Sequence, residues 1–157
     1  MEINMKAELR DWLTKQKWDI GATLTFAHDV TPEFASKTIG RFWNRVDKNL
    51  YNNAAYRYNK RCQRVMFIEG SEYGTRHHYH AAIKMPQDRF DEADRFCQFL
   101  RKQWRAECYQ NKIIEFKPTQ NSNRLINYIT KHIHSFDCDT FDVNTSHITI
   151  TDPLNSI

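Results

Sequence analysis

The hydrophobic positions along this chain follow two periods, one typical of strands and one typical of helices. Short β-rich runs predict strands at residues 20–27, 64–69, 77–85 and 112–117. Apolar residues spaced three or four positions apart predict helices at residues 3–17, 32–50, from about 86 to 104, and 121–134. Residues 147–151 form a further short β-like piece and are a candidate fifth strand.

The predicted elements follow the order helix, β-α-β-β-α-β, helix. This is the order of the ferredoxin-like or RRM-like split β-α-β fold, in the α+β class. It predicts a central antiparallel sheet of four or five strands with helices packed on one face. Two glycines within residues 70–76 predict the turn that pairs the third strand with the second. Residues 51–61 are polar, basic and aromatic, and we expect them to form a loop.

Composition narrows the class of protein. A length of 157 residues with 40% hydrophobic residues suits one domain, so we expect residues 1–157 to form a single unit. No apolar run approaches the ~18 residues that span a membrane, and the charged N-terminal segment does not resemble a signal peptide. The four cysteines lack CxxC spacing, which is typical of reduced thiols in a cytoplasm. The net charge of +4 mildly favours a polyanionic partner.

The stretch TRHHYHAAIKMP crowds three histidines into four positions. Side chains alternate along a strand, so His78 and His80 share one face while Tyr79 points to the other, toward the core. Both imidazoles can then reach one metal ion. Glu69 ends the preceding predicted strand and would lie across from His78. Two histidines and one carboxylate leave open positions on a divalent ion, as a catalytic site requires.

Other interpretations of these residues stay open. Histidines at this spacing also occur solvated on a sheet edge, and Glu72, inside the predicted turn, is a rival ligand. A second His-x-His pair, His132 and His134, lies in or just after the last predicted helix, where residues two apart point to different faces. A zinc site formed by that pair with Cys138 would fit no familiar finger spacing.

The last predicted helix carries a second group of interest. Tyr128 and Lys131 are three residues apart and therefore neighbours on one helix face. Leu125, Ile129 and Ile133 occupy another face, which we expect to be buried. An ordinary amphipathic tyrosine at the boundary of a core, beside a solvated lysine, would produce the same pattern.

Taken together, these motifs resemble the HUH endonucleases, specifically the rolling-circle replication initiators of the single-tyrosine type. The shared pattern is an apolar strand, here TLTF, then a carboxylate, then His-hydrophobic-His, then Tyr-x-x-Lys on a helix. The resemblance covers about residues 20–135, the expected catalytic core. One departure is Tyr79, which is larger than the usual aliphatic residue between the histidines.

The resemblance implies a chemistry and a role for each residue. Glu69, His78 and His80 would bind Mg²⁺ or Mn²⁺. Tyr128 would attack one strand of DNA and form a 5′-phosphotyrosine, with Lys131 adding positive charge beside the phosphate or the phenolate. The substrate would be single-stranded DNA at the replication origin of a plasmid or virus, in the cytoplasm of a host that is bacterial or archaeal.

The same resemblance leaves alternatives within and beyond the enzyme class. A transposase or a relaxase of the superfamily is one, although relaxases place the tyrosine ahead of the histidines and transposases tend to carry Gln near it. A DNA-binding regulator that has lost cleavage is another, although a regulator has no need of all five residues. The sequence contains no G-x-x-x-x-G-K-[ST] motif, so we expect no helicase domain and a dependence on a host helicase and polymerase.

The predicted loop YNNAAYRYNKR interleaves aromatic and basic residues. Aromatic faces stack on unpaired bases and cations meet phosphates. We therefore predict DNA contacts here, although a solvated loop with one or two tyrosines packed beneath it would give the same pattern. The predicted DNA-binding residues are Tyr56, Arg57, Tyr58, Lys60 and Arg61.

Overall fold

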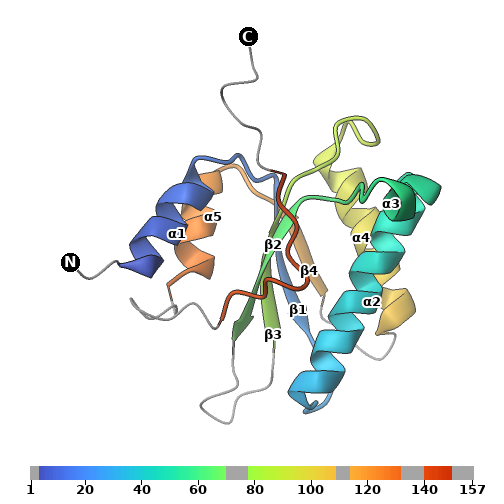
Figure 1. Ribbon diagram of the computed structural model, residues 1–157, viewed down its shortest axis with the longest axis horizontal. Coiled ribbons are helices and arrows are strands. Elements are labelled where there is room, and N and C mark those ends of the chain that lie inside the picture. The colour runs from blue at the N-terminus through green and yellow to red at the C-terminus, as the bar shows by residue number, and fades with distance from the viewer. Residues whose placement is uncertain (1–3, 70–77, 109–113, 132–139, 150–157) are drawn as a thin grey trace.

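The computed structural model describes residues 4–69, 78–108, 114–131 and 140–149. This part of the chain forms one open antiparallel sheet with helices on it, which confirms the α+β prediction (Figure 1). The sheet has the order β2-β3-β1-β4. Its strands are β1 (Ile20–Thr25), β2 (Arg64–Glu69), β3 (His78–Ile83) and β4 (Ile114–Pro118). The helices are α1 (Met5–Thr14), α2 (Pro32–Tyr51), α3 (Asn53–Arg57), α4 (Ala93–Glu107) and α5 (Ser122–Ile129).

The helix boundaries follow local chemistry, with three differences from prediction. The expected loop at residues 51–61 contains α3, because Asn52 adopts a φ of 51° that ends α2 and a new turn starts at once. Helix α4 begins at Ala93, since Pro86 first closes a tight turn with its carbonyl. Helix α5 ends at Ile129, and residues 132–134 of the longer predicted helix lie outside the described residues. None of the described helices is long and apolar enough to cross a bilayer.

Helices cover both faces of the sheet, so the expectation of helices on one face is wrong. Helices α2 and α4 pack on the face that carries Leu24, Tyr79 and Phe116. Helices α1 and α5 pack on the opposite face, over a second core that includes Val65 and Phe67 (Figure 1). Strand β2 is apolar on both faces, and that second face must also be covered.

The outer edge of β2 is covered by residues 140–149. Backbone hydrogen bonds join Arg64 to His147 and Ile68 to Thr140. The candidate fifth strand at residues 147–151 is thus a single bridge at His147, and its last two residues lie outside the described part of the chain. Covering an edge in this way prevents it from pairing with another chain.

A buried ion pair fixes the start of β2. The guanidinium of Arg64 lies 3.0 Å from Asp47 of α2, and the two side chains are only 5% and 1% exposed. Arg64 Nε also donates to the carbonyl of Thr145, and its guanidinium lies over the ring of Trp43. This one side chain therefore links β2 to α2 and to the C-terminal segment.

Replacing Asp47 with Ala should destabilise the fold strongly, because it leaves the buried charge of Arg64 without its partner. We expect a loss of about 3–5 kcal/mol in the free energy of unfolding, measured by urea denaturation with tryptophan fluorescence. The control is Asp11→Ala, which removes an exposed pair with Lys15 and should cost less than about 1 kcal/mol. Equal losses in the two variants would contradict this role for the pair.

Candidate active site

The three predicted metal ligands meet where β2 ends and β3 begins. Glu69 pairs directly with His78 in the antiparallel register, and His80 lies one pleat further along the same face. Both histidines direct Nε2 at the same Glu69 oxygen, at 3.2 Å for His78 and 2.6 Å for His80. The ligand atoms of all three residues lie within 4.8 Å of one another, which confirms that they converge.

This donor set suits a divalent cation. Ligands at about 2.1 Å in octahedral geometry stand about 3 Å apart when adjacent, and the two measured separations lie on either side of that value. Two imidazoles and one carboxylate leave further positions for substrate oxygens. Among the described residues, no other group of three His, Cys, Asp or Glu side chains has such spacing. The rival ligands Glu72, His132, His134 and Cys138 lie outside the described residues.

His80 lies in a more enclosed setting than the sequence suggested. We expected both histidines to face away from the core, but their face carries the second core, and His80 is 7% exposed. Burial lowers the pKa of His80, and the neighbouring Glu69 carboxylate opposes that shift. The ring is therefore neutral near pH 7, the form in which an imidazole binds metal.

Thr23 completes the setting of His80 from the neighbouring strand. The register places Thr23 directly opposite His80, with Oγ1 at 3.4 Å from the ring Nδ1. A partner on the far ring nitrogen orients a ligating histidine and selects its tautomer. Sequence reasoning missed Thr23, since only the register between β1 and β3 makes the two residues neighbours.

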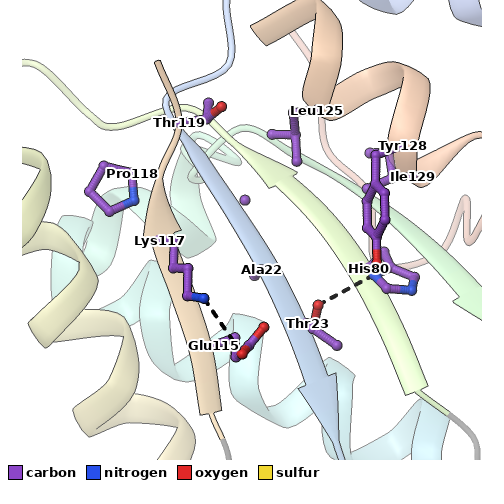
Figure 2. Close-up of a pocket in the computed structure, with 11 residues that line it drawn as sticks. Ala22, Thr23, His80, Glu115, Lys117, Pro118, Thr119, Leu125, Tyr128 and Ile129 are labelled. Carbon is purple, nitrogen blue, oxygen red and sulfur yellow. Dashed lines mark hydrogen bonds and ion pairs between the residues drawn. The ribbon is translucent and has the colours of Figure 1, made fainter. Parts of the chain in front are cut away.

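Tyr128 stands over the ligand cluster from α5. Its ring centroid lies 5.6 Å from that of His80 in an edge-to-face arrangement, and the side chain is 52% exposed. Figure 2 shows its hydroxyl end directed toward His80. Ile126 and Ile129 are buried and set the roll of the helix. Lys131 lies on the same side, with Nζ 4.5 Å from the centre of the Tyr128 ring, as the spacing on the helix predicted.

Comparison with protein families agrees with this arrangement. The family model of the replication-associated protein ORF2 matches residues 19–136, which include all four strands and both halves of the site. The chain belongs to this family. No curated protein and no solved structure gives a significant match.

Helix α1 lies outside the region matched by the replication-associated family, yet it holds the end of α5. Lys6 Nζ donates to the carbonyl of Lys131 at 3.0 Å, and Arg10 Nε donates to Thr130 Oγ1 at 3.0 Å. These contacts steady the turn that follows Tyr128. No local pattern could have identified Lys6 and Arg10, because their partners are more than a hundred residues away in the chain.

The predicted DNA-binding residues lie away from the ligand cluster. Tyr56 and Tyr58 are 68% and 79% exposed. Lys60 pairs with Asp88, and Arg61 contacts Asp47. Helix α3, which ends at Arg57, lies on the α2 side of the sheet, near the end where β2 starts, whereas the ligand cluster lies where β2 finishes (Figure 1).

Metal binding can be tested without an activity assay. Mn²⁺ at about 100 times its dissociation constant should stabilise the wild-type protein by about 2.7 kcal/mol and raise its Tm. The same addition should leave the Tm of His80→Ala unchanged, with each variant compared with itself in chelator because His80 is buried. His28→Ala, at an exposed histidine, is the control and should respond like the wild type. An undiminished response of His80→Ala would exclude the cluster as the site.

Proposed function

We propose that this protein is a metal-dependent endonuclease that cuts one DNA strand at a replication origin and becomes linked to its 5′ end through Tyr128. The observation that carries the proposal is the placement of the Tyr128 ring edge-to-face with His80, over a cluster of three candidate metal ligands. The family match supports a role in replication initiation. The substrate we propose is single-stranded DNA at the origin, in the cytoplasm of a host cell.

Each residue of the site has a separate task in this proposal. Glu69, His78 and His80 would hold Mg²⁺ or Mn²⁺, which when bound polarises the phosphate oxygens and stabilises developing negative charge. Lys131, with Nζ over the Tyr128 ring, would place a second positive charge beside the phosphate or the phenolate. Thr23 would hold His80 in its ligating orientation.

The proposed reaction exchanges one phosphodiester for another. The Tyr128 oxygen forms a bond to phosphorus, and the bond from phosphorus to the 3′ oxygen breaks. The phenol loses its proton and the departing oxygen gains one, which yields a 3′-hydroxyl and a 5′-phosphotyrosine. A free tyrosine has a pKa of about 10 and is a weak nucleophile unaided. Because bond energy is retained, no ATP is needed and rejoining can run in reverse.

DNA would also be held away from the cut. Tyr56, Arg57 and Tyr58 project from α3 into solvent, as stacking and phosphate-binding residues require. They lie toward the start of β2, and Glu69 ends that strand about 17 Å further along. We infer that α3 contacts the strand or duplex outside the nicked site. Strand separation and synthesis would fall to a host helicase and polymerase.

Tyr128→Phe should abolish the covalent adduct. The change removes one oxygen from a half-exposed side chain, so folding and DNA affinity should stay close to those of the wild type. The assay incubates the protein with a library of single-stranded oligonucleotides and Mn²⁺, then separates denaturant-resistant adducts on a gel. Mass spectrometry of the wild-type adduct should place the nucleotide on Tyr128.

Tyr51→Phe, at a tyrosine in the opposite core, is the matched control and should form adduct at the wild-type rate. Adduct formation by Tyr128→Phe, or an adduct mapped to another tyrosine, would refute the assignment. Specific binding by the wild type without any adduct would instead indicate a DNA-binding regulator on the same fold.

The role of α3 can be measured by the salt dependence of binding. In a Tyr128→Phe background, Arg57→Ala should weaken binding to single-stranded DNA and lower the slope of log K against log salt by about 0.7. Tyr58→Ala should weaken binding by about 1–3 kcal/mol through lost stacking. Fluorescence anisotropy with a labelled oligonucleotide gives both values. Lys102→Ala, an exposed lysine on α4, is the control, and an equal effect there would show that α3 has no special part.

A further inference from the structure

A groove of about 280 Å³ opens beside Tyr128, between α5 and strands β1 and β4 (Figure 2). Thr23 lies on its floor, while Leu125 and Ile129 form an apolar wall together with the ring of Tyr128. The groove also includes His80, so it adjoins the metal-ligand cluster directly. Its volume lies below the range of about 300–1,000 Å³ typical of pockets for drug-sized ligands, which suits a smaller, flat group.

Sheet register and helix packing together create this groove. One cross-strand row runs from His80 through Thr23 to Glu115. In the next row Lys117 lies opposite Gly21, and α5 approaches closely only there: a Cβ on Gly21 would come within 2.8 Å of the Leu125 side chain. The helix therefore stops short of β4, and the groove remains between them.

The far rim of the groove carries one acceptor and one donor. Glu115 and Lys117 lie on the groove side of β4, whereas Phe116 between them is buried in the opposite core. Their side chains are 52% and 72% exposed, and 3.6 Å separates the paired atoms. A loose, exposed pair of this kind contributes little stability. Both groups can therefore turn to a ligand at small cost.

We propose that this groove holds one unpaired base of the strand that Tyr128 cuts, and that Glu115 and Lys117 select that base. The inference rests on the proposed cleavage by Tyr128. The apolar wall suits the flat face of a base. The carboxylate accepts from a base N–H, and the ammonium donates to a ring nitrogen or carbonyl. Because Tyr128 borders both the groove and the ligand cluster, the selected base lies next to the cleaved phosphate.

The test is a sequence profile of the oligonucleotides that enter the adduct. A library with a randomised segment is incubated with wild type, Glu115→Gln, Lys117→Gln and the double variant, in Mn²⁺, and the attached strands are sequenced. We expect the wild type to prefer one base at a position adjacent to the cut by roughly 5- to 150-fold. The variants should lose that preference and keep the preferences at other positions.

The control pair is Glu33→Gln and Lys37→Gln, which makes the same chemical changes at exposed positions of α2 on the other side of the sheet. These variants should keep the full wild-type profile. An unchanged profile in the Glu115 and Lys117 variants, with adduct still formed, overturns the base-selecting groove alone. A uniform loss of preference at all positions also overturns it. Absence of any adduct from the wild type overturns the proposed cleavage and this inference together.

Discussion

The antiparallel register of β2, β3 and β1 is the constraint on which the site depends. It sets Glu69 against His78, and it sets His80 between Phe67 and Thr23. Side chains alternate with a period of two, so a slip of one residue would carry the histidines to the other face of the sheet. Both faces are packed with apolar side chains, so such a slip would also bury charge and expose core residues.

The second core gives the site its local character. The helices that bury Val65 and Ala82 also bring a tyrosine and a lysine over the histidines. The result is a gradient across one sheet face, from a dry region under α1 and α5 to a polar, open region over β4. Charged groups interact more strongly where water is excluded, so the most enclosed ligand, His80, lies on the dry side of that gradient.

Local patterns predicted the strands, the cap of α2 by Thr31 and the shared face of Tyr128 and Lys131, because each depends on residues close in sequence. They also placed Glu69 near the histidines, since one turn joins the two strands. The covering of the second face, the buried partner of Arg64 and the contact of Thr23 with His80 were not predictable. Each depends on a register or packing between distant segments.

Helix α5 has eight residues, and a helix shorter than about 12 residues is marginal by itself in water. Its shape is supported by Ile126 and Ile129 in the second core and by α1 at its last turn. A chain still emerging from the ribosome holds every side chain of the site but not their arrangement. Any reactivity of Tyr128 toward DNA is thereby coupled to completion of the fold, and partly folded copies are inert by construction.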